Sequence, residues 1–96
     1  MKVRLTAAAE EDLLSIFLDG AAHFGDAQAA RYHAGLGKAF DLIALNPEMA
    51  RERRELKPPV RIHPHGSHLI VYLVDAEGVL IVRVRHGHED WQSDFD

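Results

Sequence analysis

The stretch HLIVYLVDAEGVLIVRVR, residues 68–85, decides the fold of this chain. Residues 68–74 and 79–85 are rich in branched apolar side chains, which favour strands, and the segment DAEG between them is typical of a hairpin turn. Residues 60–63 give a third, shorter strand signal just before this hairpin. Near the start of the chain, residues 2–5 alternate polar and apolar side chains, which predicts one more short, half-buried strand.

Two amphipathic helices are predicted between the first strand and the last three. Thr6 can cap the first helix, and Gly25 is a natural stop for it. Its apolar positions recur at helical spacing, at Leu13, Ile16, Phe17, Gly20 and Phe24. Asp26 can cap the second helix, which ends before Pro47 because the residue preceding a proline resists the helical conformation. The link of only two residues predicts an antiparallel helical hairpin.

The order strand, two helices, three strands predicts an α+β fold, a helical hairpin packed on a small, mainly antiparallel four-stranded sheet. Residues 1–96 are long enough for one domain, and 47% apolar with 27% charged residues is a globular composition. The chain has no cysteine, which excludes a disulfide framework and suits a reducing compartment. No signal peptide or membrane span is visible, so a cytoplasmic protein is expected.

Both faces of the predicted hairpin are apolar. In its first strand, Leu69, Val71 and Leu73 alternate with Ile70, Tyr72 and Val74; in its second, Val79 and Ile81 alternate with Leu80, Val82 and Val84. A two-helix hairpin can cover only one face of a small sheet, so the other face should be an exposed patch that a partner or a second copy covers. Alternatively, residues 48–59 and the tail, with Trp91 and Phe95, fold over it.

Charge is unevenly distributed along the chain. The net charge of −4 argues against a general nucleic-acid binder. Basic residues nevertheless gather in the second half, and the tail is acidic; these groups are Arg51, Arg53, Arg54, Lys57, Arg61, Arg83 and Arg85, then Glu89, Asp90, Asp94 and Asp96. Five of the seven histidines also fall in this half, at positions 63, 65, 68, 86 and 88.

Two kinds of chemistry, metal binding and RNA cleavage, are considered for these residues. The pairs His63-Pro64-His65 and His86-Gly87-His88 could each clamp a metal, but a zinc site needs about three convergent ligands and no acid stands at supporting spacing, so no metal or cofactor is predicted. A ribonuclease could use His63 and His86 for proton transfer and hold phosphate with Arg61, Arg83 and Arg85. For the last two arginines, the alternative is a solvent-exposed strand edge. Trp91 either packs in the hydrophobic core or anchors an interface with another protein.

Several stretches, taken in order, resemble the ParE branch of the RelE/ParE toxin superfamily. LTAAAEEDLLSI, residues 5–16, is similar to its opening pattern L-T-x-x-A-x-x-D-L-x-x-I, and IVRVRHGHED, residues 81–90, is similar to its closing strand I-x-R-V-x-H-x-R-x-D. Between them, Gly25, Gln28, Ala29, Tyr32, Phe40, Leu42, Leu45, Pro47, Arg54, Glu55, Leu56 and Arg61 resemble the second helix and the basic stretch that follows it. His88 departs from the pattern, which often has arginine there.

The resemblance implies a non-enzymatic toxin that traps DNA gyrase on cleaved DNA. A cognate ParD-like antitoxin would neutralise it by wrapping a helix and an extended segment around it, and the pair would meet operator DNA only through the antitoxin; no membrane is involved. The expected target contacts are Arg61, Arg83, Arg85, His86 and Trp91, then Arg51, Arg53 and Arg54. The expected antitoxin contacts are Leu13, Phe17, Ile70, Tyr72, Val79 and Ile81. Removal of residues 90–96 should abolish toxicity and leave the fold intact.

Two other functions stay open on sequence grounds. The RelE-like branch of the superfamily cleaves messenger RNA on the ribosome, and His86, His63 and the arginines would then be its catalytic residues. An inactive module that has kept the fold and the antitoxin is the third alternative. Expression of the chain without its partner separates this last reading, because only a toxin stops growth.

Overall fold

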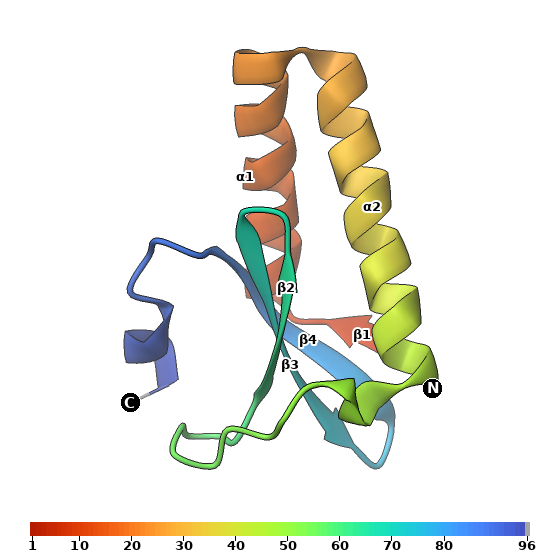
Figure 1. The fold of residues 1–96 in the computed structure, drawn as a ribbon, viewed down its shortest axis with the longest axis vertical. Helices are drawn as coiled ribbons and strands as arrows, with labels where there is room; N and C mark the ends of the chain where they lie inside the picture. Colours follow the sequence, from red (N-terminus) through yellow and green to blue (C-terminus); the bar gives the residue numbers. More distant parts are fainter. Residues whose placement is uncertain (96) are drawn as a thin grey trace.

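The computed structural model describes residues 1–95 and places two long helices over one face of a small sheet (Figure 1). The elements are β1 (Val3–Leu5), α1 (Ala7–Phe24), α2 (Asp26–Leu45), the 3-10 turn η1 (Pro47–Met49), β2 (Arg61–His65), β3 (His68–Asp75), β4 (Gly78–His86) and the 3-10 turn η2 (Trp91–Phe95). Asp96, the last acid of the tail, lies outside the described residues. The predicted α+β order is confirmed.

The sheet has the order β1-β4-β3-β2. β2, β3 and β4 pair antiparallel, whereas β1 pairs parallel with β4. β2 begins one residue later and ends two residues later than the sequence pattern predicts, and it contains Pro64. The proline is tolerated because β2 is an edge strand, where a missing N–H breaks no bond on the outer side.

The two helices begin and end on local signals. The side chain of Thr6 accepts a hydrogen bond of 3.0 Å from the backbone N–H of Ala9, which confirms the predicted N-cap of α1. Gly25, at a φ of 87°, ends α1 and also occupies the cap position of α2. The prediction that Asp26 caps α2 is therefore wrong. Asp26 is the first helical residue, where its carboxylate still faces the positive end of the helix dipole.

Two hydrophobic cores lie on opposite faces of the sheet. The first is between the helices and the sheet and includes Leu36, Ile43, Ile70, Tyr72 and Ile81. The second lies on the other face, where Leu56 and Val60 from the loop and Trp91 and Phe95 from the tail pack on Val71. The expectation of an exposed second face is therefore wrong. The chain covers that face with its own loop and tail, as the alternative proposed.

A β-bulge in β4 changes which residues share a face. Tyr72 of β3 lies opposite Ile81, but the preceding residue, Val71, lies opposite Arg83, so Val82 is the extra residue. Because of this shift, Val84 joins Val79 and Ile81 in the first core. The expected grouping of Val84 with Leu80 and Val82 is therefore wrong.

The helical hairpin projects beyond the sheet at the end where α1 turns into α2 (Figure 1). Large apolar side chains stay exposed on this projecting part and on the outer side of α1, at Leu14, Leu18 and Phe24. Within residues 1–95, neither helix is long and apolar enough to cross a lipid bilayer.

Candidate functional site

Three histidines form a row across one end of the sheet. His65 of β2 lies opposite His68 of β3, which in turn lies opposite His86 of β4. The rings of His68 and His86 are 5.3 Å apart between centroids, and His88 follows at 5.1 Å from His86. Directly opposed residues share a face of the sheet, and residues two apart in one strand point the same way. The histidine row therefore faces the helices, as Ile70 does two residues beyond His68.

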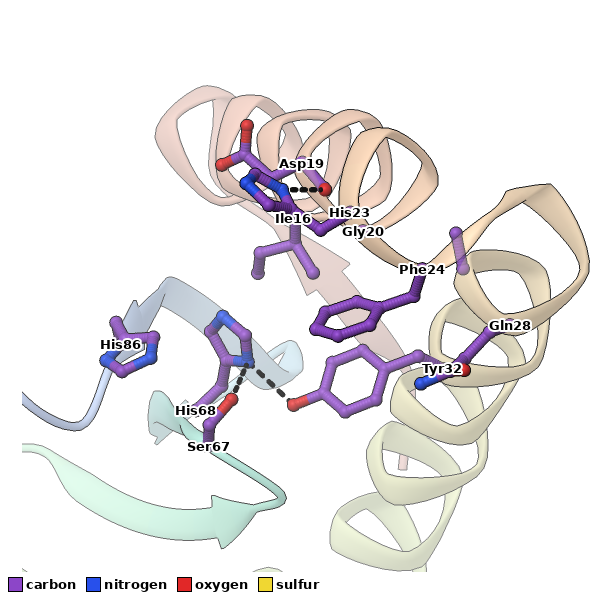
Figure 2. Close-up of a pocket in the computed structure, with 11 residues that line it drawn as sticks. Ile16, Asp19, Gly20, His23, Phe24, Gln28, Tyr32, Ser67, His68 and His86 are labelled. Carbon is purple, nitrogen blue, oxygen red and sulfur yellow. Dashed lines mark hydrogen bonds between the residues drawn. The ribbon is translucent and has the colours of Figure 1, made fainter.

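Tyr32 of α2 fixes the middle of this histidine row. Its hydroxyl donates a 3.0 Å hydrogen bond to the backbone oxygen of His65 and lies 2.6 Å from Nδ1 of His68 (Figure 2). When its single proton is donated to the His65 oxygen, the hydroxyl can only accept in the second bond, and Nδ1 of His68 is the donor. The other ring nitrogen, Nε2, is then an acceptor, and in Figure 2 it is turned away from Tyr32 and toward Ile16 of α1.

Two further features favour the neutral form of His68 and fix its position. Burial lowers the pKa of His68, and the neighbouring His86 and His65 lower it further, against an opposing effect of Glu89. The turn before His68 contains Gly66 at a φ of 56°, and a Cβ there would lie 2.7 Å from the Tyr32 hydroxyl oxygen. The glycine therefore allows the turn to adopt its shape and Tyr32 to pass over it.

Asp12 of α1 anchors the free edge of β4. Its carboxylate accepts hydrogen bonds from Nε and NH2 of Arg83, at 2.7 and 2.9 Å, and from the backbone N–H of Val84, at 2.9 Å. The pairing of β1 with β4 stops at Ile81, so Asp12 satisfies an N–H that a longer β1 would have bound. The hydrogen bond that Arg83 donates to Asp12 raises the pKa of Arg83, which stays charged and paired.

Arg85 is held by the tail. It binds Glu89 at 2.8 Å and also binds Asp94. The second oxygen of Glu89 accepts the backbone N–H of His86 at 2.9 Å, and the hydrogen bond from Arg85 lowers the pKa of Glu89. Both arginines of β4 are thus neutralised by acids of the same chain.

The residues expected to form a ribonuclease site are only partly brought together: Arg83, Arg85 and His86 line one cleft, whereas His63 and Arg61 do not. Arg83 and Arg85 lie opposite Val71 and Leu69, which belong to the tail-covered face, whereas His86 faces the helices. His63 is one row away from the histidine row, opposite Ile70, and burial lowers its pKa. Arg61 donates a hydrogen bond to the backbone oxygen of Ala50.

The other expected target contacts divide into buried and exposed residues. Trp91 is 7% exposed and packs in the second core, so it is a core plug and offers little surface to a target. Arg53 pairs with Glu55, and the Cζ atom of its guanidinium lies 5.9 Å from the centroid of the Trp91 ring. Arg51 and Arg54 are exposed, and Arg54 forms only a surface ion pair with Glu52.

The expected antitoxin contacts divide in the same way. Ile70, Tyr72, Val79 and Ile81 are 0% exposed in the first core, so they present no surface to a partner. Leu13 and Phe17 remain accessible. They line an open, mostly apolar cleft of about 470 Å³ between the helices, together with Glu10, Leu14 and His33.

Two clefts open beside the histidine row. The first, of about 450 Å³, lies between the helices and the row and is lined by Phe24 and Tyr32 at one end (Figure 2). The second, of about 390 Å³, runs along the edge of β4 past Asp12, Arg83, Arg85 and Glu89. The two share Ile16, Asp19, His68 and His86, so they form one groove. Within residues 1–95, no three histidine or acidic side chains converge as a metal site requires.

Comparison with known proteins places this geometry in a family. Residues 3–91 match the family model described as the ParE toxin of the type II toxin–antitoxin system parDE. The chain belongs to the ParE toxin family. It is 36% identical over 87 residues to Toxin ParE1 of Mycobacterium tuberculosis, and the aligned region covers 90% of this chain and 89% of that protein. It is 34% identical over 83 residues to Toxin ParE1 of Caulobacter vibrioides, covering 86% and 85%.

A solved structure shares the fold. A chain of the chromosomal ParDE toxin–antitoxin system from P. aeruginosa superimposes with a TM-score of 0.76, covering 90% of this chain and 95% of that one, at 17% sequence identity. The two-helix, four-stranded architecture is thus shared with a chain of that system. The resemblance found in the sequence is confirmed at the level of the family.

The hydrogen-bonded centre of the site in this ParE-family chain includes residues to which the sequence analysis gives no target-binding or catalytic role. It considers His65 only as part of a metal-binding pair, and it assigns no role to His68 or Tyr32, although it counts all five C-terminal-half histidines. The two-residue turn Gly66-Ser67 gave the signal that His65 and His68 are opposed, since a tight hairpin pairs its flanking residues. The opposition of His68 and His86 depends on the bulge at Val82, for which the sequence carries no signal.

Proposed function

We propose that this ParE-family toxin is a proteinaceous inhibitor of DNA gyrase, without catalytic activity of its own, that a cognate ParD-like antitoxin neutralises. Membership of the ParE family carries the proposal. The state of the β4 arginines supports it against RNA cleavage. Arg83 and Arg85 are paired with acids, and neither is available to hold a phosphate together with His86.

Exposed cations on the loop before β2 are the strongest candidates for contact with gyrase or its DNA. Arg51 and Arg54 point into solvent, and Arg53 is held beside them by Glu55 and Trp91. Exposed arginines suit a phosphate or carboxylate surface because the guanidinium offers several donors in one plane. The tail acts indirectly in this proposal, because Trp91 and Phe95 support the loop through the second core.

The test is a gyrase cleavage assay with the purified chain, supercoiled plasmid and ATP, in which protein is digested before electrophoresis. Accumulation of linear DNA that depends on both gyrase and the chain supports the proposal. A folded chain that yields no linear DNA contradicts it. In that case, the same protein is tested on messenger RNA bound to ribosomes, where cleavage would support the RelE-like alternative.

The cleft lined by Leu13 and Phe17 is the proposed seat of a helix of the antitoxin. Leu14 and Leu18, spaced one helical turn apart on α1, are 60% and 57% exposed and extend its apolar surface. An amphipathic helix binds such a groove through apolar residues at matching spacing. In the complex, operator DNA would be contacted by the antitoxin alone, since the toxin is acidic overall.

Growth assays separate a toxin from an inactive module. Expression of the chain alone should stop growth, and co-expression of the antitoxin encoded beside its gene should restore growth. Leu14→Glu should keep toxicity and lose this rescue, because a buried charge in the cleft opposes helix binding. Growth that continues in the absence of the antitoxin would contradict the proposed toxicity.

A further inference from the structure

Two arginines of β4 each direct one donor at the same oxygen atom. NH1 of Arg83 lies 3.6 Å from Oδ2 of Asp94, and NH1 of Arg85 donates a hydrogen bond to that oxygen. The two arginines are two residues apart in one strand, so they point to the same side of the sheet, the side that the tail covers. Together they form a site for one oxyanion, and the side chain of Asp94 occupies it.

Two other acids hold these guanidinium groups by different nitrogens. Asp12 accepts from Nε and NH2 of Arg83, and Glu89 accepts from NH2 of Arg85. The NH1 groups are not used in these contacts, because a guanidinium has five N–H donors. The two arginines therefore stay oriented toward a common point when Asp94 is away, and a ligand that binds there pays little to order them.

The tail does not depend on Asp94 for its position. Trp91 and Phe95 on either side of it are buried in the second core, and the backbone N–H of Lys57 donates to the oxygen of Phe95 at 2.9 Å. The Asp94 side chain itself is 29% exposed. It can rotate into solvent while the second core stays covered, and a partly exposed ion pair is weak enough to be exchanged.

The surroundings of this site favour a single carboxylate as its ligand over nucleic acid. Asp12 and Glu89 already balance the charges of Arg83 and Arg85, so a further anion binds through oriented donors and gains little from net charge. A nucleic-acid strand would bring a row of phosphates to a chain whose net charge is −4. The carboxylate of an acidic side chain brings one charge and has the shape of the group that is already bound.

We infer that Arg83 and Arg85 bind one acidic side chain of the target protein, and that Asp94 competes with it from within the same chain as an autoinhibitory contact. The inference rests on the proposed function, since it takes gyrase as the target. The site lies on the same side of the sheet as the loop cations, because Arg53 of the loop lies against Trp91 of the tail. It adds one specific carboxylate contact to that surface.

The strength of this inhibition follows from the fraction of molecules in which the site is open. The apparent affinity for the target is reduced by that fraction. An ion pair with the exposure of Asp94 closes the site by at most about fivefold. Removal of the Asp94 carboxylate should therefore strengthen target binding, whereas loss of a residue that contacts the target would weaken it.

The first experiment tests the site without the target, with acetate as the probe and the full chain. In ¹H–¹⁵N spectra, acetate should shift the Nε–Hε resonances of Arg83 and Arg85 at about fivefold lower concentration in Asp94→Ala than in the wild-type chain. Asp90→Ala is the matched control, because Asp90 is an exposed acid of the tail that pairs with neither arginine within residues 1–95. It should titrate as the wild type does. The same acetate concentration for all three proteins would overturn the inference.

The second experiment measures the concentration of chain that gives half-maximal linear DNA in the gyrase cleavage assay. It should fall about fivefold for Asp94→Ala and stay the same for Asp90→Ala. In the background of Arg85→Gln, shown to be folded by urea denaturation, Asp94→Ala should no longer change it. An unchanged concentration for Asp94→Ala in the wild-type background would overturn the autoinhibition and leave the proposed function standing. A wild-type chain that yields no linear DNA would overturn the proposed function and gyrase as the ligand, while the acetate titration still decides whether the arginine site exists.

Discussion

The carboxylate of Asp12 on α1 binds the side chain of Arg83 and the backbone N–H of Val84 on β4 at the same time. The partners are 71 and 72 residues apart in sequence. This contact continues the edge of the sheet where β1 ends, and it fixes α1 against β4 beside the groove. The three bonds tie the position of the helical hairpin to the geometry of the groove.

Replacement of Asp12 should therefore lower stability. Asp12→Ala leaves a partly buried guanidinium and a backbone N–H without their acceptor, and we expect a loss of about 2–3 kcal/mol in the free energy of unfolding, measured by urea denaturation. Glu11→Gln, at an exposed neighbouring position, is the control and should change stability by less than about 0.5 kcal/mol. Equal unfolding midpoints for the two variants would show that the contact is not stabilising.

The tail should matter for the fold as well as for toxicity. Trp91 and Phe95 are 7% and 4% exposed, and the backbone N–H of Lys57 donates to the oxygen of Phe95 at 2.9 Å. Removal of residues 90–96 would uncover the second core, so we expect it to destabilise the fold and not to leave it intact. Trp91→Ala should cost about 3–5 kcal/mol in thermal unfolding.

Gln92→Ala is the matched control for the tail, because Gln92 lies in the same 3-10 turn and is exposed. It should leave both the unfolding temperature and toxicity unchanged. If Trp91→Ala were as stable as Gln92→Ala, then Trp91 would act at the target surface and not through the second core.

Stability should decrease as the solution is acidified below about pH 6.5, the usual pKa of histidine. Burial lowers the pKa of His68 and of His63 in the folded chain, so the unfolded chain binds protons first. Their contribution is complete above the unfolded pKa and is lost as the pH falls toward the folded one. Urea midpoints between about pH 7.5 and pH 5.5 measure this slope.

His68→Gln should flatten that pH dependence, and His33→Gln should not, because His33 is an exposed residue of α2 outside the row. Tyr32→Phe removes the hydroxyl that holds Nδ1 and should lower stability at neutral pH. A slope that is the same in wild type and in His68→Gln would assign the acid sensitivity to other groups.

The exposed arginines of the loop should control the effect on gyrase. The double replacement Arg51→Ser and Arg54→Ser should reduce gyrase-dependent linear DNA about tenfold, because both side chains are exposed and available to a target. Lys38→Ser removes an exposed cation from α2 and serves as the control. Unchanged cleavage by the double variant, with normal folding, would move the target surface elsewhere.

Much of the fold could be predicted from periodicity. Apolar spacing predicted both helices and the hairpin of β3 and β4, and Thr6 and Gly25 marked the ends of α1. Periodicity identifies an apolar face, but not the surface that covers it. The sequence alone therefore could not decide whether Trp91 meets a partner or the second core.

The site was less accessible to sequence reasoning because its contacts are long-range. Spacing places Arg83 and His86 on one strand, but it does not reveal that Asp12 and Glu89 neutralise the arginines there. Tyr32 reaches His68 from a helix 36 residues away, and nothing in either local pattern indicates the contact.

The bulge at Val82 has a consequence for how this site can vary. The hairpin turn sets one register for β3 and β4, and the bulge sets a second register for the half that ends in the histidine row. In the first register continued without interruption, Arg85 would lie opposite His68 in place of His86. Loss of the bulge with the number of residues in β4 unchanged would thus replace a titratable ring in the row with a permanent cation. The ligand chemistry of the groove can change by a shift of strand register as well as by substitution.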